Sequence, residues 1–297
     1  MAIEKRIVEL PNGLKVYVEH HVFDPAFETV IMINGALATT ASFGQTIKYL
    51  SENLNSICFD LPYAGQSRAH NGACEFVLSK EDEVEILLHL CQRFEPEYLL
   101  SVSWGGVASL FALARGCTSV RRAAITSFCP FLNDPMVDYV TRARDHIAAG
   151  ENLKAAQLLN DTVGAYLPRI MKLYNYRYLT KLPRSEQDQV AFHVNQILEM
   201  RPEEYLDDFR NIGCDVKFVN GDLDIYTAPS DVRRLAEYVP QAEFTVISGA
   251  GHFLDLEGRD QQTQMRTLLL DYFRDEDVSP HGAVNGGFKL VPDSLAA

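Results

Sequence analysis

Short apolar runs that alternate with helix-like segments constrain the fold more than any other feature of this sequence. Six runs rich in β-branched and aliphatic residues follow one another: TVIMING at 29–35, NSICFD at 55–60, YLLSVS at 98–103, RAAITSF at 122–128, DVKFVNG at 215–221 and EFTVIS at 243–248. Continuous apolar runs are typical of strands covered on both faces, as in a parallel sheet. Helical segments are expected between them, at 43–53, 79–94, 105–115, 230–238 and 256–273. The alternation predicts βαβ units and a mainly parallel α/β sheet.

Two further strands are expected at the N-terminus. RIVEL at 6–10 and KVYVEH at 15–20 alternate in polarity and are separated by the turn signal PNG, which is typical of a hairpin. Together with the six runs they give a mostly parallel eight-stranded sheet with helices on both faces. Within the helical segment 79–94, Ser79 and Asp82 have the spacing of a capping box.

The interval from Asn133 to Asp208 departs from the alternation of strands and helices, because it shows only helical patterning, interrupted at Pro168, Pro183 and Pro202. Such an insertion between the sixth and seventh strands predicts a helical cap over the edge of the sheet where ligands bind. Residues 140–185 also carry eight basic side chains against three acidic ones. This charge fits either a solvated helical surface or a landing surface for an acidic or phosphorylated partner.

These patterns divide the protein into four segments. We expect a first part of the core at 1–132, the helical cap at 133–208, a second part of the core at 209–275, and a disordered tail at 276–297, which is polar, rich in Gly and Pro and aperiodic.

Composition narrows the functional class. The formal net charge of −13 argues against general nucleic-acid binding, which needs a basic surface. The six cysteines form no CxxC pair and no cluster at metal-ligand spacing, so a reducing cytoplasm is the expected compartment. The first residues lack the apolar core of a signal peptide, and no apolar run has the length of a membrane span. Since metal, nicotinamide and nucleotide motifs are also missing, we expect no cofactor.

The stretch LLSVSWGGVA at 99–108 places Ser103 between a strand and a helix, with the small residues Ser101 and Gly105 two positions to either side. This is the layout of a nucleophile elbow, in which a strained turn presents the serine hydroxyl. Taken alone, the S-x-S-x-G match is weak, and such a serine is more often an ordinary turn residue.

A serine nucleophile needs a base, and the base needs an acid that fixes its tautomer. In α/β-hydrolase sheets these residues follow in the order Ser, Asp, His at strand ends. FVNGDLDIYTAP supplies Asp224, with Asp222 as a competitor two residues away, and GAGHF supplies His252 after the last strand. We prefer Asp224 because it precedes a helix that begins with a proline, and we predict the triad Ser103, Asp224 and His252.

An oxyanion hole needs two backbone amides. The residue after the nucleophile, Trp104, offers the first. NGA at 34–36 follows the first strand of the parallel set, so Ala36 is the candidate for the second, with a simple strand-ending turn as the alternative. The run FDLPYAGQS at 59–67 has the D-x-P-x-x-G-x-S layout, to which we assign a role in loop geometry and not in chemistry.

Several motifs together point to a family resemblance. NGALATTASF, FDLPYAGQSRAHN, DEVEILL, SVSWGG, AYLPRI and GAGHFLDLE resemble the HAA synthases of the rhamnolipid pathway. They are also similar to the sister group, the 3-hydroxyacyl carrier protein to coenzyme A transferases of polyhydroxyalkanoate synthesis. The likeness spans about residues 7–275 and implies an α/β-hydrolase fold with Ser103, Asp224 and His252 as triad. DLPYAGQS and EDEVEILL favour the synthase, INGALATTASF and LYNYRYL the transferase, and we prefer the synthase.

By this resemblance the protein is an acyltransferase that esterifies two 3-hydroxyacyl groups into 3-(3-hydroxyalkanoyloxy)alkanoate, the lipid precursor of rhamnolipids, through an acyl-serine. Its partners are then 3-hydroxyacyl-coenzyme A or a 3-hydroxyacyl carrier protein, in the cytoplasm, with a transient contact at the inner membrane left open. The alternatives are a 3-hydroxyacyl carrier protein to coenzyme A transacylase, a plain esterase or thioesterase of the same fold, and a noncatalytic ligand receptor.

Overall fold

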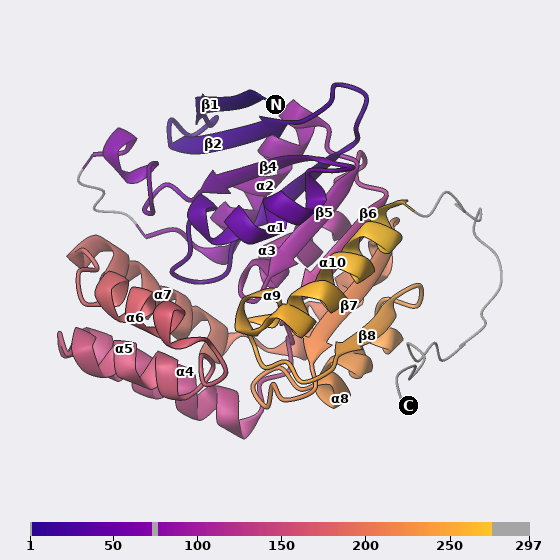
Figure 1. Cartoon of the computed structure of the whole chain (residues 1–297). Coiled ribbons are helices and arrows are strands. Elements are labelled where there is room, and N and C mark those ends of the chain that lie inside the picture. The colour runs from indigo at the N-terminus through magenta and orange to yellow at the C-terminus, as the bar shows by residue number, and fades with distance from the viewer. Residues whose placement is uncertain (1, 73–76, 275–297) are drawn as a thin grey trace.

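A single eight-stranded sheet organises the computed structural model, which describes residues 2–72 and 77–274 (Figure 1). The strand order is β1-β2-β4-β3-β5-β6-β7-β8. β1 and β2 form the N-terminal hairpin, β2 pairs antiparallel with β4, and every other neighbouring pair is parallel. The strands are β1 Ala2–Glu9, β2 Lys15–Val22, β3 Thr29–Ile33, β4 Asn55–Asp60, β5 Tyr98–Val102, β6 Arg122–Thr126, β7 Asp215–Gly221 and β8 Glu243–Ile247. The expected α/β class, with a mostly parallel eight-stranded sheet, is confirmed.

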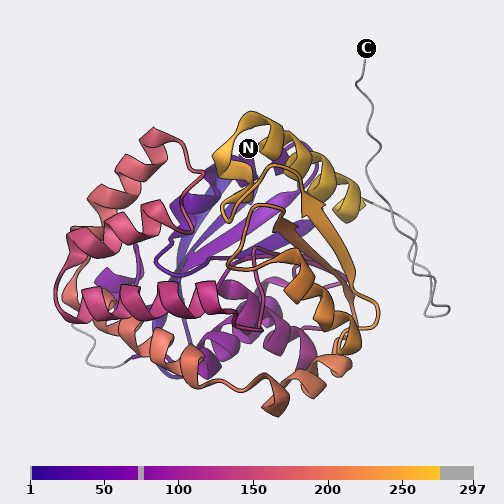
Figure 2. The ribbon, with the colours of Figure 1, turned by 90° about the horizontal axis from the view of Figure 1, so that it is seen from below.

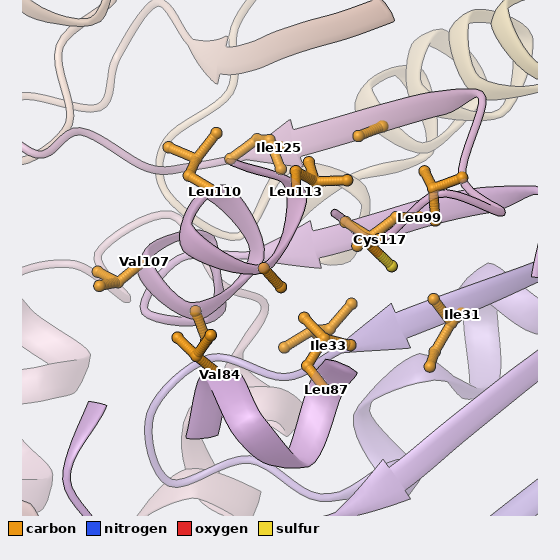
Figure 3. Close-up of a cluster of buried hydrophobic side chains, with 14 of the residues drawn as sticks. Ile31, Ile33, Val84, Leu87, Leu99, Val107, Leu110, Leu113, Cys117 and Ile125 are labelled. Atoms are coloured by element: carbon orange, nitrogen blue, oxygen red, sulfur yellow. The ribbon is translucent and has the colours of Figure 1, made fainter. Parts of the chain in front are cut away.

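Helices cover both faces of this sheet, because the central strands are apolar on both sides. In β3, Ile31 and Ile33 belong to one buried cluster, whereas Val30 and Met32 belong to another on the opposite face. The first cluster is packed by α2 and α3, as Figure 3 shows for the side chains around Ile33. The second is packed by α1 and α10. The helices of the core are α1 Gly44–Leu50, α2 Lys80–Phe94, α3 Gly105–Ala114, α8 Pro229–Val232, α9 Leu254–Glu257 and α10 Arg259–Arg274, with the 3-10 helices η1 Thr40–Phe43, η2 Arg68–His70 and η5 Arg233–Glu237.

The helix boundaries follow local chemistry. At the start of α2, Ser79 Oγ accepts the amide of Asp82 at 3.1 Å, and the Asp82 carboxylate accepts the amide of Ser79 at 2.8 Å, so the expected capping box is present. The helix expected at 256–273 is divided into α9 and α10, because the backbone at Gly258 is extended. The segment 230–238 is likewise only one turn of α-helix, α8, followed by the 3-10 helix η5.

Four helices stand between β6 and β7 and form a layer of their own beside the sheet (Figures 1 and 2). They are α4 Asp134–Ala148, α5 Asn152–Asp161, α6 Arg169–Leu179 and α7 Arg184–Glu199, and the 3-10 helices η3 Pro202–Glu204 and η4 Leu206–Asn211 lead back to the sheet. The prolines expected as interruptions stand at helix starts: Pro168 and Pro183 precede α6 and α7, and Pro202 opens η3. Proline suits these positions because the first amides of a helix need no intrahelical acceptor.

We call the segment from α4 to α7, including the loops that connect its helices, the cap. Its helices lie inside the interval 133–208 assigned to a cap from sequence, and the segment boundaries themselves stay a prediction. The tail expected at 276–297 lies outside the described residues. Across residues 2–72 and 77–274, no helix combines the length and apolar character that crossing a membrane requires.

Candidate active site

Ser103 stands on a sharp turn between β5 and α3. Its φ is 50°, a left-handed conformation that is strained for any residue other than glycine. Two glycines make the turn possible: a Cβ at Gly105 would lie 2.6 Å from the Asn34 carbonyl oxygen, and one at Gly106 would lie 2.5 Å from the Phe128 ring. The glycines after the serine are therefore required by close packing, as a nucleophile elbow demands.

The three residues predicted as a triad come together at the carboxyl ends of β5, β7 and β8. His252 Nε2 is 3.0 Å from Ser103 Oγ, and His252 Nδ1 is 2.8 Å from Asp224 Oδ2. Asp224 and His252 are buried. The imidazole thus has one ring nitrogen on the hydroxyl and the other on the carboxylate, which is the arrangement that lets it take and return a proton.

Asp224 is held as an ionised carboxylate. Burial raises its pKa, but the charge and hydrogen bond of His252, together with hydrogen bonds from Thr227 and the Tyr226 amide, outweigh burial and lower the pKa to about 2. Thr227 Oγ1 donates to Oδ2 at 2.6 Å, and the Tyr226 amide donates to Oδ1 at 2.9 Å. The competitor Asp222 instead accepts the amide of Ala250 at 3.2 Å, so it stabilises the neighbouring loop.

The loop of His252 is fixed by two residues that the sequence analysis missed. The Glu257 carboxylate accepts the amides on both sides of the histidine, that of Gly251 at 2.6 Å and that of Phe253 at 2.9 Å. Ser127 Oγ donates to the carbonyl oxygen of His252 itself at 2.6 Å. The only signal in the sequence is a glutamate five residues after the histidine, which has no general meaning without the loop geometry.

The loop after β3 lies against Ser103. A Cβ at Gly35 would lie 3.2 Å from Ser103 Cβ, so the backbone that leads into Ala36 passes directly beside the elbow. Trp104 is the N-terminal cap of α3, and the first amides of a helix have no partner within it. Both amides proposed for the oxyanion hole therefore belong to backbone next to Ser103, and their role in binding an oxyanion stays a prediction.

Asp60 ties this loop to the one after β4. Its Oδ1 accepts the amide of Thr40 and its Oδ2 the amide of Gln66, each at 2.7 Å, although burial raises the pKa of the carboxyl. Ser67 Oγ donates to the carbonyl oxygen of Asp60 at 2.6 Å, and Gly65 takes a positive φ where a Cβ would strike the carboxylate. The D-x-P-x-x-G-x-S run thus shapes a loop, the role assigned to it from sequence.

The cap contacts both loops that carry His252 and Asp224. A Cβ at Gly251 would lie 2.5 Å from the ring of Tyr166, which places that cap residue over the His252 loop. On the Asp224 side, the rings of Tyr139 in α4 and Tyr226 pack edge to face, with centroids 5.8 Å apart. The cap therefore borders the triad from above the strand ends.

A buried polar cluster joins α2, the cap helix α7 and the elbow. Lys80 Nζ is 2.7 Å from Glu83 Oε2, and His193 Nε2 is 3.2 Å from Glu83 Oε1. Lys80 Nζ also lies 4.6 Å from the centroid of the Trp104 ring, and the His193 ring lies 5.8 Å from it. His193 does not follow a strand, so its place in the sequence does not mark it as a site residue. Its environment comes from side chains far away in the sequence, which no local pattern reveals.

His193 makes folding stability depend on pH. Burial lowers its pKa to about 4, against attraction to Glu83, whereas the unfolded protein keeps an ordinary histidine near 6.5. Between these values the unfolded state binds more protons, so the free energy of unfolding falls as pH drops from about 6.5 to about 4. We expect His193→Gln to reduce this slope, measured by urea unfolding at a series of pH values. His70→Gln, at an exposed site, should leave it unchanged, and an unchanged slope in His193→Gln would refute the assignment.

One group among the described residues has side chains close enough to hold a metal ion: Glu19, His21 and Cys58, on β2 and β4. Glu19 already accepts a hydrogen bond from Tyr17 at 2.5 Å and lies 3.1 Å from His21 Nε2. The three residues do not overlap with the triad, so we assign them no part in the chemistry proposed below.

Comparisons with known proteins agree with this architecture. The sequence model of the alpha/beta hydrolase fold family matches residues 28–258. The (R)-3-hydroxydecanoyl-ACP:CoA transacylase of Pseudomonas aeruginosa is 40% identical over 280 residues, which cover 93% of that enzyme and 94% of this chain. The enzyme of the same name from Pseudomonas putida is 40% identical over 274 residues, 92% of each protein.

Solved structures show the same fold at low identity. MGS-M2, an alpha/beta hydrolase from a deep-sea metagenome library, superposes with a TM-score of 0.76 at 18% identity, covering 99% of its own length and 93% of this protein. A bromoperoxidase from Bacillus anthracis superposes with a TM-score of 0.75 at 14% identity, covering 100% of its own length and 92% of this protein. The expected family resemblance is confirmed, and the curated relatives favour its transferase branch over the synthase branch that the sequence analysis preferred.

Proposed function

The chain belongs to the α/β-hydrolase fold family, and from that premise we propose that it is an acyltransferase that moves a 3-hydroxyacyl group from an acyl carrier protein to coenzyme A. The observation that carries this proposal is the 40% identity, over nearly the whole length, to curated transacylases with that donor and acceptor. A row of Ser103, His252 and Asp224 at hydrogen-bonding distances supports a covalent route through an acyl-serine.

In the first half of the proposed reaction, His252 Nε2 takes the proton of Ser103 as Oγ attacks the thioester carbon. The carbonyl oxygen becomes an oxyanion beside the amides of Trp104 and Ala36. When the C–S bond breaks, the imidazolium returns its proton to the leaving thiolate, so the carrier leaves as a thiol and the acyl group stays as an ester of Ser103. Asp224 stabilises the charged imidazole throughout.

In the second half, the thiol of coenzyme A takes the place of the departed carrier. His252 accepts its proton, the sulfur attacks the acyl ester, and a new C–S bond forms as the C–O bond to Ser103 breaks. The proton returns to Ser103 Oγ, and the enzyme is regenerated. Transfer competes with hydrolysis only while water is kept from the acyl-serine, which is a suitable task for a cap that borders the His252 loop.

The runner-up differs only in the second acceptor. In the HAA synthase reaction, the 3-hydroxyl of a second acyl group attacks the acyl-serine, and the resemblance in DLPYAGQS favours this outcome. The first half-reaction, the triad and the carrier donor are common to both. Both reactions draw on cytoplasmic thioesters, so we propose a cytoplasmic location, while contact with the inner membrane stays a prediction.

One incubation separates these functions. Purified protein is mixed with 3-hydroxydecanoyl carrier protein and free coenzyme A, and the products are identified by mass spectrometry, with Ser103→Ala as the control for uncatalysed exchange. We expect 3-hydroxydecanoyl-coenzyme A. A dimeric ester would instead establish the synthase, and free 3-hydroxydecanoic acid alone would establish a thioesterase and refute the proposal.

A further inference from the structure

The cap helix α6 turns its apolar side outward. Ile170, Leu173, Tyr174 and Arg177 have the spacing i, i+3, i+4 and i+7, which places them on one face of the helix. Such a face usually packs on the core. Here Ile170 is 73% exposed, Tyr174 57% and Leu173 45%. We call these four residues the α6 stripe.

The side of α6 opposite the stripe packs against the rest of the cap. Leu179 is its buried residue, and Asn160 of α5 donates to the Lys172 carbonyl oxygen at 2.9 Å. Asn175 also reaches Asn160. The side of α6 opposite the α6 stripe therefore holds the helix in the cap, and the stripe itself is the outer face. Five of the thirteen exposed large hydrophobic residues in the described part of the protein fall between 166 and 176, so apolar exposure is concentrated here.

The charge around the stripe is as unusual as its exposure. Residues 162–185 contain five Lys or Arg and no Asp or Glu, in a protein whose net charge is −13. Elsewhere in the cap, cations are paired, as Arg142 is with Asp138 and Arg144 with Asp145. Within the part of the chain that the structure describes, the side chains of Arg169, Arg177 and Lys181 make no ion pair. An apolar strip bordered by uncompensated positive charge favours an acidic partner.

The stripe is also well placed for the active site. α6 begins three residues after Tyr166, whose ring lies over Gly251 next to His252. A partner seated on α6 is thus held beside the rim of the site, at the start of a helix about 16 Å long. This suits a protein that delivers its thioester on a flexible arm, which spans the distance between the docking surface and Ser103.

We propose that the α6 stripe, together with Arg169 and Lys181, is the docking surface for the acidic acyl carrier protein that presents the donor; this inference rests on the function proposed above. A transient, steered complex needs only a small contact with complementary charge. Three apolar side chains are too little for stable membrane anchoring. They are also too little for the roughly 800 Å² per partner of a stable dimer.

Two double variants test the surface. Arg169→Glu with Arg177→Glu reverses its charge, and Ile170→Ser with Tyr174→Ser removes two of its apolar side chains. We expect the KM for 3-hydroxydecanoyl carrier protein to rise at least about tenfold. With the N-acetylcysteamine thioester, which needs no docking, kcat/KM should stay within about twofold of wild type. Lys48→Glu with Arg266→Glu makes the same charge change on α1 and α10 and should have no effect. Equal losses with both donors would overturn the proposal.

Binding measured without turnover separates the two proposals. In a Ser103→Ala background, fluorescence anisotropy of labelled carrier protein should show binding that weakens in both α6 variants and with added salt. Unchanged binding in the variants overturns the docking surface, even if the protein that keeps Ser103 transfers the acyl group to coenzyme A. Weakened binding in the variants, combined with no coenzyme A product from the protein that keeps Ser103, supports the surface and refutes the transacylase. The surface is also overturned if the variants lose only binding to phosphatidylglycerol vesicles, or only a dimer seen by light scattering.

Discussion

Replacing Ser103 with Ala is expected to lower turnover by at least about four orders of magnitude. The variant keeps the fold but loses the oxygen that forms the acyl ester, so both half-reactions fail. Intact-protein mass spectrometry gives the sharper readout: wild-type protein mixed with a 3-hydroxydecanoyl thioester, without coenzyme A, should gain the mass of one acyl group. The Ser103→Ala protein should gain none.

The matched control is Ser101→Ala, two residues earlier on β5. Ser101 is fully buried, and its hydroxyl has no hydrogen-bond partner among the residues described. Removing this hydroxyl should therefore leave acylation intact. An acyl adduct that survives in Ser103→Ala, or one that disappears in Ser101→Ala, would show that another group is the nucleophile.

The Asp224→Asn variant is expected to lose about three to four orders of magnitude in kcat/KM. The amide no longer carries the charge that stabilises protonated His252, and its NH₂ group favours the wrong imidazole tautomer. Because the pKa of Asp224 is lowered to about 2, the carboxylate is ionised at every pH at which activity would be assayed. Titration of Asp224 itself should therefore not shape the activity of the wild-type protein in this range, and kcat/KM of both proteins measured from about pH 6 to pH 9 would give the size of the loss.

Asp222→Asn is the control for this second variant. Its Oδ1 only accepts the Ala250 amide, and an asparagine oxygen can replace that acceptor. We expect an effect below about tenfold. A loss in Asp222→Asn as large as that in Asp224→Asn would transfer the acidic role to Asp222.

Periodicity was sufficient to predict the layers of this fold. Strands such as β3 are apolar at successive residues, and Val30 and Ile31 indeed enter clusters on opposite faces. The strand order was not accessible in the same way, because β4 lies outside β3 through a crossover that depends on packing between distant residues. The break at Gly258 was missed although glycine is unfavourable inside a helix, because a lone glycine does not show whether a helix continues or ends there.

The grouping of Ser103, Asp224 and His252 could be predicted because each of them follows a strand, and the carboxyl ends of parallel strands meet at one edge. The residues that hold it in place could not. Ser127 donates to the carbonyl oxygen of His252, 125 positions away in the sequence. Glu257 accepts backbone amides, and nothing in a sequence distinguishes such a glutamate from any other acidic residue. The acceptor in the proposed reaction was equally hidden, because the same three residues serve the transacylase and the synthase proposals alike.

The cap leaves the sheet after β6 and returns at β7, and these two strands are direct neighbours, with Arg122 paired to Asp215. Because β6 and β7 are parallel, the chain departs at the carboxyl end of β6 and re-enters at the amino end of β7, and the segment between them can change in length without breaking the hydrogen bonds that join the two strands. Ser103, Asp224 and His252 all stand outside it. Changes in the cap can therefore alter which molecules reach these three residues and still leave in place the strand ends that hold them.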